Sequence, residues 1–266
     1  MIIKRKSKIG RKYNLLKDTH DPRDYRWTLP PHLRDVPLPS SVDLRPTMPP
    51  VYDQGPYGTC YANAVAGAVH FLQNKRVTPS RLYIAWNACV CEGETVIAEE
   101  NGIVSLRDTI SPLTDKGYVP EASWPYDRDH LNVIPFTSCF ADGATHLVTS
   151  YERLLVLSND LQSIKTALAE GRPVIFGMQV YKQFESASCA ATGIVETPGW
   201  WDRQFNCLGG HAVLAVGYDD ATQMFTVRNS WSSGWGRAGY FFLPYDYMSN
   251  SGLTNDFWVL NGLVDK

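Results

Sequence analysis

One stretch constrains the fold of this chain more than any other: residues 52–64, where a glycine-containing loop runs into an apolar-periodic helix. Val65, Val69 and Leu72 follow at helical spacing and predict a helix that begins close to Cys60. The thiol then lies in the first helical turn, where free N–H groups and the positive end of the helix dipole favour a thiolate. The sequence therefore places a candidate nucleophile where a loop becomes a helix.

Gln54 precedes this cysteine by six residues and could turn its amide N–H groups toward the same space. Together with the Cys60 backbone N–H, it would stabilise a developing oxyanion. A single cysteine at the start of a helix is more often a small, buried apolar residue. A catalytic role for Cys60 and Gln54 is therefore favoured only if another part of the chain supplies a base.

A histidine and an amide that meet the thiol only in the folded chain are the expected partners. His211 follows two glycines and opens an apolar run that predicts a buried strand. Asn229 ends a second predicted strand, and Trp231 comes two residues later. The amide oxygen could fix the imidazole tautomer, and the indole could cover that hydrogen bond. A histidine taken singly is usually structural, but the three residues together indicate acyl transfer.

In these residues the chain resembles the papain-like cysteine peptidases, the family of papain and the cathepsins. The matching pieces occur in the family's order, at residues 54–55, 58–61, 210–213, 217–218, 229–231, 234–236 and 239–240. Weaker similarities at residues 38–45 and 118–126 extend the resemblance over about residues 38–260.

The resemblance implies a role for each matching residue. Cys60 would be the nucleophile and His211 its proton partner. Asn229 would orient the imidazole, Gln54 would donate to the oxyanion, and Trp231 would shield the His–Asn hydrogen bond.

The resemblance also implies the residues that bind substrate. Asn101 and Gly102 would offer their backbone to the peptide as an antiparallel edge, with a plain turn as the alternative. Phe176 and Met178 resemble the wall of the pocket for the second residue before the scissile bond, which suggests an apolar side chain there. Asp256, at the floor of this pocket, would instead attract Arg or Lys. The expected substrate contacts are Asn101, Gly102, Phe176, Met178, Gly210, Trp231 and Trp235, the last as a wall beyond the scissile bond.

Two departures from the family pattern affect the catalytic loop. Tyr57 stands three residues before the nucleophile, where the family has a disulfide-bonded cysteine. Thr59 and Tyr61 flank the nucleophile, where the family has serine and tryptophan. No catalytic group is lost, so these changes bear on the stiffness of the loop and not on its chemistry.

The resemblance implies an α+β fold of two lobes with the active-site cleft between them. Residues 38–140 would form a mainly helical lobe that carries the nucleophile. Residues 141–266 would form an antiparallel sheet or partial barrel that carries the histidine and asparagine. Predicted helices begin at Cys60, cover 79–88 and 106–116, and follow a cap at Asn159; predicted strands cover 173–180, 211–218, 223–229, 239–243 and 256–260.

Residues 1–37, called the leader below, differ from the rest of the chain. Six lysines and arginines lie within the first 12 residues, a run that is most often a solvated tail and alternatively contacts a phosphate-bearing ligand or an anionic surface. Tyr25 and Trp27 stand in a charged segment and need a surface to cover. Because papain-like zymogens carry a leader through the cleft, we expect residues 13–37 to pack on the catalytic lobes and partly block the non-primed side.

The formal net charge of −2 provides no field for DNA, and no run of about 18 apolar residues could cross a membrane. The mechanism implied by the resemblance needs neither a metal nor an organic cofactor. Peptides or proteins are the expected substrates of an expected monomer.

Six cysteines leave five once Cys60 is set aside, enough for at most two disulfides. Cys89 and Cys91 are too close in sequence to bond to each other. The resemblance suggests that one of them pairs with Cys139, and a second pair would be Cys189 with Cys207. The alternative is that all five are reduced and buried, as in the cytosol. We expect at least one disulfide, which would favour an extracellular, cell-surface or lytic compartment.

No histidine lies between Cys89 and Leu106, where the carboxydipeptidase members hold a capping loop, so the prediction is an endopeptidase. Two alternatives stay open. One is a transpeptidase or amidase on the same triad, and the other is a non-catalytic papain-like binding protein, against which the presence of all four catalytic groups argues.

Overall fold

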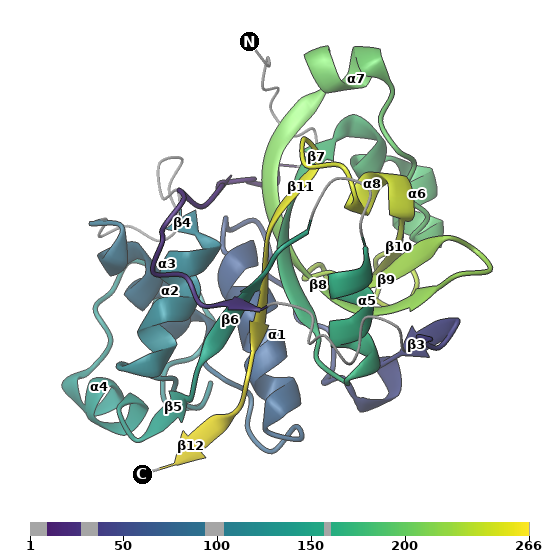
Figure 1. Ribbon diagram of the computed structural model, residues 1–266. Coiled ribbons are helices and arrows are strands. Elements are labelled where there is room, and N and C mark those ends of the chain that lie inside the picture. The colour runs from purple at the N-terminus through teal and green to yellow at the C-terminus, as the bar shows by residue number, and fades with distance from the viewer. Residues whose placement is uncertain (1–9, 28–36, 94–103, 157–160, 266) are drawn as a thin grey trace.

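The computed structural model describes residues 10–27, 37–93, 104–156 and 161–265. Two lobes lie side by side in Figure 1, one built mainly of helices and the other of a curved sheet. The α+β fold with two lobes that the sequence predicted is confirmed.

The helical lobe contains four helices of the described chain: α1 (Cys60–Leu72), α2 (Arg81–Cys91), α3 (Leu106–Ile110) and α4 (Thr137–Gly143), with the 3-10 turns η2 (Arg45–Thr47) and η3 (Ser111–Thr114). α2 begins two residues later than predicted because the Ser80 hydroxyl accepts the Tyr83 N–H at 3.1 Å and caps the helix. α3 gives way to the η3 turn just before Pro112, which cannot continue an α-helix.

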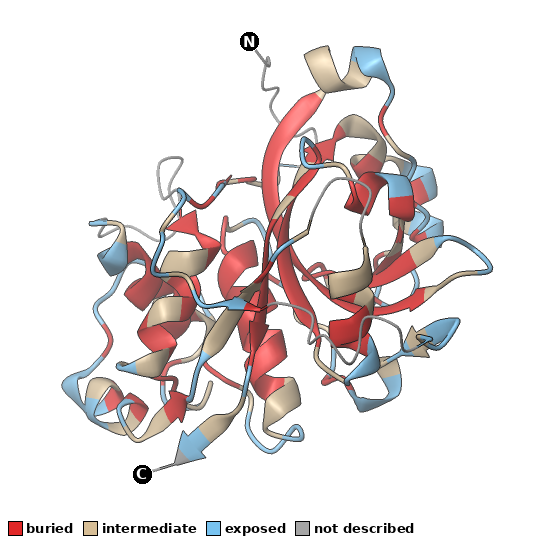
Figure 2. Ribbon diagram, in the orientation of Figure 1, coloured by how far each residue is buried: buried red, intermediate tan, exposed pale blue. Residues whose placement is uncertain are grey.

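Helix α1 packs directly on the sheet, and this contact fixes the position of its first residue. Small residues such as Ala62 and Ala66 are fully buried in the contact. A Cβ at Gly67 would lie 3.5 Å from the Leu214 side chain, so the helix approaches the sheet closely. In Figure 2 the buried, red part of the molecule is concentrated along α1 and the long strand β8.

The β lobe is an eight-stranded sheet in which the order β10-β9-β8-β7-β11-β6-β2 is joined by β3 on β8. Its strands are β2 (Arg26–Trp27), β3 (Ser41–Asp43), β6 (Tyr151–Leu154), β7 (Val174–Tyr181), β8 (Cys207–Asp219), β9 (Met224–Arg228), β10 (Tyr240–Pro244) and β11 (Thr254–Leu260). The central pairings are antiparallel, and His211 of β8 lies opposite Met178 of β7. β2, which belongs to the leader, pairs in parallel with β6.

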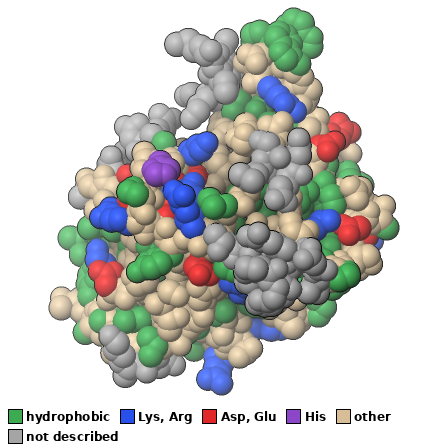
Figure 3. Space-filling view, viewed as in Figure 1, with side chains coloured by type: hydrophobic (Ala, Val, Ile, Leu, Met, Phe, Trp, Pro, Cys, Tyr) green, Lys and Arg blue, Asp and Glu red, His purple; other side chains and the backbone are tan. Residues whose placement is uncertain are grey.

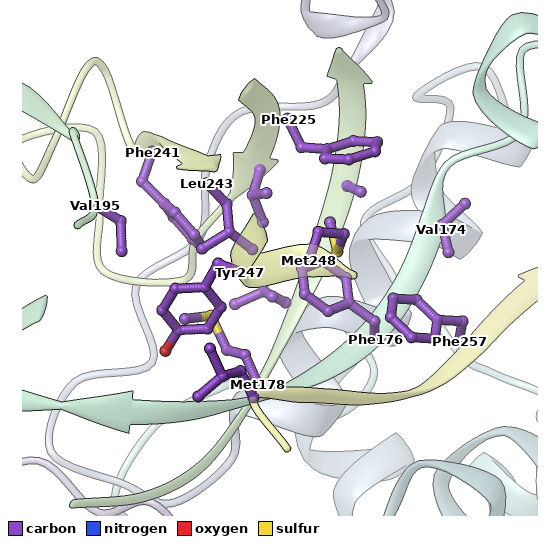
Figure 4. Close-up of a cluster of buried hydrophobic side chains, with 14 of the residues drawn as sticks. Val174, Phe176, Met178, Val195, Phe225, Phe241, Leu243, Tyr247, Met248 and Phe257 are labelled. Atoms are coloured by element: carbon purple, nitrogen blue, oxygen red, sulfur yellow. The ribbon is translucent and has the colours of Figure 1, made fainter. Parts of the chain in front are cut away.

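Side chains of this sheet alternate between two apolar environments. Ile175 points toward α1, whereas Phe176 and Met178 point into the interior of the β lobe. Figure 4 shows Phe176 beside Phe257 in that interior, where the two rings stack with centroids 5.5 Å apart. The interior is closed by aromatic and aliphatic side chains from several strands, so the lobe has its own core.

The remaining elements lie at the edges of the lobes. They are β1 (Leu15–Leu16) and β4 (Val104–Ser105), which pair in parallel; β5 (His146–Val148) and β12 (Leu263–Asp265), which pair antiparallel; and α5 (Gln162–Ala169), η4 (Lys182–Glu185), α6 (Ala187–Thr192), α7 (Trp200–Phe205) and α8 (Tyr245–Met248). Asn159, the expected cap of α5, lies outside the described residues. α7 projects from the β lobe, and its exposed side chains, Trp200 and Trp201 among them, form the green tip at the top of Figure 3.

All six cysteines belong to the described part of the chain, and none forms a disulfide, so the expectation of at least one is wrong. Cys89 is buried beside α1, with its sulfur 3.5 Å from the Tyr61 hydroxyl. The Cys139 thiol instead donates to the Ser123 carbonyl in a separate small cluster. Cys207 turns its sulfur to the Gln179 side chain and not to Cys189. Cys89 and Cys139 therefore lie in different clusters, whereas Cys189 and Cys207 share the core of the β lobe without bonding to each other.

Candidate active site

Cys60 lies at the first position of α1, at the junction of the two lobes. The backbone N–H of Ala212, the residue after His211 on β8, donates to the Cys60 sulfur at 3.4 Å. This contact joins a residue of the helical lobe to the strand that carries the histidine, across 152 residues of sequence. The tertiary fold therefore brings the predicted nucleophile next to the strand of its predicted base.

His211 is held by Asn229, with 2.9 Å between the imidazole Nε2 and the amide Oδ1. The Asn229 oxygen also accepts the Ser230 N–H at 2.8 Å. Since a backbone N–H can only donate, that contact identifies the facing atom as oxygen, and Nε2 must carry the proton. His211 Nδ1 has no hydrogen-bond partner among the described residues, so its lone pair is available to accept a proton.

Aromatic rings cover this pair. The Trp231 indole lies over the His211 ring, with centroids 5.1 Å apart and planes 28° from parallel. Trp235 meets Trp231 edge to face at 4.9 Å. Because all three side chains are buried, the His–Asn hydrogen bond is protected from competition with water.

Gln54 is fixed by the segment that carries the asparagine. Its side-chain oxygen accepts from the Ser230 hydroxyl at 2.5 Å, and its backbone N–H donates to the Ser230 carbonyl at 2.9 Å. The amide nitrogen donates one hydrogen to the Tyr57 carbonyl at 2.7 Å, which leaves its second hydrogen for a ligand. Sequence reasoning missed Ser230 as the residue that orients Gln54, although its position next to Asn229 was a usable signal.

A second positioning residue that the sequence analysis did not single out is Tyr126. Its hydroxyl donates to the Gln54 carbonyl at 2.9 Å and lies 2.5 Å from the Thr59 hydroxyl. Because the Tyr126 proton goes to the carbonyl, Thr59 is the donor in the second contact. One phenol thus ties both ends of the catalytic loop in which Tyr57 replaces the family's disulfide-bonded cysteine.

The described part of the leader lies across the junction of the lobes, where its purple trace runs in Figure 1. Tyr13 meets the His211 ring edge-on, with centroids 5.9 Å apart, and Leu15–Leu16 pairs with Val104–Ser105. A Cβ on Gly209 would lie only 2.6 Å from the Tyr13 carbonyl oxygen. A Cβ on Gly210 would collide with the Leu15 carbonyl oxygen. The predicted substrate contact Gly210 therefore faces the leader, which lies directly against β8.

Beyond the cleft, a cluster of charges fastens the leader. Asp24 receives two hydrogen bonds from the Arg107 guanidinium, at 2.6 and 2.7 Å, and one from Arg153 at 3.1 Å. Asp18 accepts the Trp258 indole N–H at 2.9 Å. The Asp18 backbone N–H donates to the Asp256 carboxylate at 2.7 Å. Asp256 therefore belongs to the leader's docking site, with Arg153 as its ion-pair partner.

Burial acts strongly on the catalytic pair. It raises the pKa of Cys60 to about 11, against hydrogen bonds from backbone N–H groups that favour the thiolate. It lowers the pKa of His211 to about 4, against the hydrogen bond to Asn229. Burial in the covered site therefore opposes the thiolate that the start of the helix favours. The pair is held as a neutral thiol and a neutral imidazole, because neither ion can be solvated there.

Four of the predicted substrate-binding residues are not placed in the cleft by the described structure. Asn101 and Gly102 lie outside the described residues. Phe176 and Met178 lie in the interior of the β lobe and not in the cleft, because the strand alternates and turns Gly177 outward. A Cβ on Gly177 would be 2.9 Å from the Leu15 side chain.

The described residues contain no group of three or more His, Cys, Asp and Glu side chains that could hold a metal ion.

Comparison with known proteins agrees with this geometry. Residues 38–259 match the family described as papain family cysteine protease. An uncharacterized peptidase C1-like protein of Acanthamoeba polyphaga mimivirus is 32% identical over 284 residues, covering 97% of this chain and 89% of the viral protein. Digestive cysteine proteinase 1 of Homarus americanus is 28% identical over 237 residues, covering 83% of this chain and 66% of that protein.

The fold has been seen in solved structures. The crystal structure of xylellain, a cysteine protease from Xylella fastidiosa, matches with a TM-score of 0.85 and 34% sequence identity. The match covers 98% of this chain and 99% of xylellain, so it includes the leader as well as both lobes.

Within the described residues, no helix is long and apolar enough to cross a membrane.

Proposed function

This chain belongs to the papain family of cysteine proteases, and from that premise we propose that it is an endopeptidase held inactive by its own leader. The catalytic assignment rests on two contacts. His211 is hydrogen-bonded to Asn229, and the Cys60 sulfur accepts the N–H of Ala212, the next residue on the strand of His211. The observation that supports inhibition is Tyr13 on the His211 ring.

The proposed reaction proceeds through an acyl-enzyme. His211 Nδ1 takes the proton of Cys60, and the sulfur attacks the peptide carbonyl carbon while the carbonyl electron pair moves to oxygen. The Cys60 N–H and the Gln54 amide hold that oxyanion. Collapse of the tetrahedral intermediate breaks the C–N bond as the imidazolium protonates the leaving amine. His211 then removes a proton from water, which attacks the thioester and releases the acid.

The direction of the leader supports inhibition without cleavage. Leu15–Leu16 runs parallel to Val104–Ser105, whereas the family resemblance implies an antiparallel substrate at Asn101 and Gly102, just before this strand in the sequence. The leader therefore crosses the site with reversed polarity. Its peptide bonds then present their carbonyls in the opposite sense to a substrate, so they cannot enter the oxyanion site in a reactive orientation.

The first prediction tests the leader. Deletion of residues 1–37, or Leu15→Glu in the full chain, should raise kcat/KM for a quenched peptide by about 100-fold or more, since docking must be undone before substrate binds. The glutamate would lie against Gly177 and Gly210, a contact made for an apolar side chain. Leu16→Glu, at an exposed neighbouring position, is the matched control and should change little. Equal turnover by the native chain, the deletion variant and Leu15→Glu would refute inhibition by the leader.

The same assay separates the alternatives. Cys60→Ala should abolish peptide cleavage and labelling by an epoxide inhibitor. If the chain is a non-catalytic binding protein, the unsubstituted chain will show neither cleavage nor labelling. With an added amine as acceptor, an endopeptidase gives mainly the free acid, and a transpeptidase gives mainly the amide product. Mass spectrometry of the products measures that ratio directly.

A further inference from the structure

Arg11 of the leader occupies a defined place beside the catalytic pair. Its guanidinium carbon lies 3.6 Å from the centroid of the Trp231 ring, well within the range of a cation–π contact. Trp231 is almost completely buried and is held by stacking against His211, so its indole is a rigid platform. A leader residue thus places a cation on a wall of the cleft.

Carboxylates accompany this aromatic platform. The Tyr13 hydroxyl donates to Glu185 of η4 at 2.7 Å, which places that carboxylate at the edge of the cleft. Burial lowers the pKa of Arg11, while Tyr13, Glu185 and the exposed Asp53 act in the opposite direction. The leader therefore uses both parts of a receptor for a cation, an aromatic face and a carboxylate.

The order of contacts along the leader locates this receptor. Leu15 lies beside Val104, Tyr13 lies on His211, and Arg11 lies on Trp231. Arg11 is thus on the opposite side of the catalytic pair from Val104. Because the segment before Val104 is the expected edge for residues that precede the scissile bond, Trp231 faces the residues that follow it.

Departure of the leader would open this place to a substrate. It removes Arg11 from the indole and the Tyr13 hydroxyl from Glu185, so a carboxylate oxygen and an aromatic face become available together. An arginine matches both, since its planar guanidinium stacks on an indole and still donates to a carboxylate at its edge. Lysine matches less well because its ammonium group does not stack.

We infer that Trp231 and Glu185 form a subsite for an arginine side chain on the leaving-group side of the scissile bond, and that Arg11 occupies it in the docked leader. The inference rests on the proposed endopeptidase function and names its substrate class: peptides with arginine at the first or second position after the cleaved bond. Because the leader runs in the reverse direction, its side chain marks the subsite while its backbone does not fix which position is read.

The test uses the full chain carrying Leu15→Glu and quenched peptides that differ only in arginine or citrulline, its uncharged isostere, at each of the two positions. At one position, arginine should give a kcat/KM about tenfold higher than citrulline. Glu185→Gln in the same background should reduce that ratio to about twofold. Glu170→Gln removes the same charge from the C-cap of α5 and should leave the ratio unchanged.

A ratio near one at both positions, or a ratio that survives Glu185→Gln, would overturn the subsite while leaving the endopeptidase intact. Failure of Leu15→Glu to cleave any peptide would remove the proposed function and the subsite with it.

A second measurement does not require the Leu15→Glu substitution. In the otherwise native chain, Arg11→Gln and Glu185→Gln should each raise the residual turnover, and the double variant should fall clearly below the product of the two effects. Independent, multiplying effects would show that Arg11 and Glu185 do not interact.

Discussion

At Cys60 and His211, burial acts on both partners in the direction opposite to that which catalysis requires. Thiolate and imidazolium are the reactive forms, yet the covered site favours thiol and imidazole. Tyr13 contributes directly, since it lies against the His211 ring and shields it from water. The proposed inhibition would therefore be electrostatic as well as steric, because the docked leader excludes the solvent that would stabilise the ion pair.

This predicts a pH profile for one thiol. In the full chain, alkylation of Cys60 by chloroacetamide should be slow at pH 7.5 and rise with pH past 9, toward the raised pKa. Leu15→Glu should move the rise below pH 7. Peptide mapping by mass spectrometry reports each cysteine separately, and Cys91, which is exposed, serves as the internal control. Coincident profiles of Cys60 in the two proteins would contradict the shielding role of the leader.

At the scale of elements, the catalytic loop is braced by hydrogen bonds where the family uses a disulfide. Tyr126 links the Gln54 carbonyl to the Thr59 hydroxyl, and the Arg81 guanidinium lies 3.9 Å from the centroid of the Tyr126 ring. The Asn63 side chain adds a hydrogen bond to the Thr59 carbonyl at 2.9 Å. The loop and the first turn of α1 are thus held from the side opposite the sheet.

Tyr126→Phe should therefore lower kcat about tenfold with little change in KM, because Gln54 and Cys60 lose their fixed spacing. The free energy of unfolding should fall by about 1–2 kcal/mol. Tyr245→Phe also removes a tyrosine hydroxyl bonded at 2.7 Å, to Asp220, but in the β lobe away from the cleft. Both variants, made in the Leu15→Glu background, should lose similar stability, and only Tyr126→Phe should lose kcat. Equal kcat values would limit Tyr126 to a structural role.

At the scale of the whole molecule, leader docking brings three carboxylates and two arginines from four chain segments together. Asp18 and Asp24 of the leader and Asp256 of β11 share two arginines, Arg107 of α3 and Arg153 of β6. Burial raises the pKa of Asp18, and burial together with the charge of Asp18 raises the pKa of Asp256 to about 6, against Arg153 and Lys17. Although burial acts the other way, hydrogen bonds from Arg107 and Arg153 lower the pKa of Asp24.

Docking should then become weaker as the pH rises through about 6. A carboxylate whose pKa is raised in the docked state binds its proton there more tightly, so its contribution is complete below about pH 4 and lost above about pH 6. The ratio of kcat/KM in Leu15→Glu to that in the native chain should be about tenfold larger at pH 5 than at pH 7.5. Asp256→Asn should flatten this dependence. A ratio that grows with pH would contradict the assignment.

From the sequence alone came the four proposed catalytic residues, the helix that begins at Cys60 and the strands next to His211 and Asn229. These features are local: a period of apolar residues, a glycine before a strand, an amide after one. The helix predicted over residues 106–116 was too long, because α3 ends at Ile110 and Pro112 lies in the 3-10 turn that follows.

Only the tertiary structure decided which way side chains face and what they meet. The run Val174–Tyr181 is apolar except for Gln179 and is buried on both faces, so no regular polar alternation shows that Gly177, and not Phe176 or Met178, faces the cleft. Cys89 and Cys139 likewise stayed unpaired because their side chains enter separate clusters, which sequence spacing does not record. Ser230, Tyr126 and Glu185 gained their roles from partners more than 60 residues away in sequence, since hydrogen bonds and ion pairs depend on distance in space.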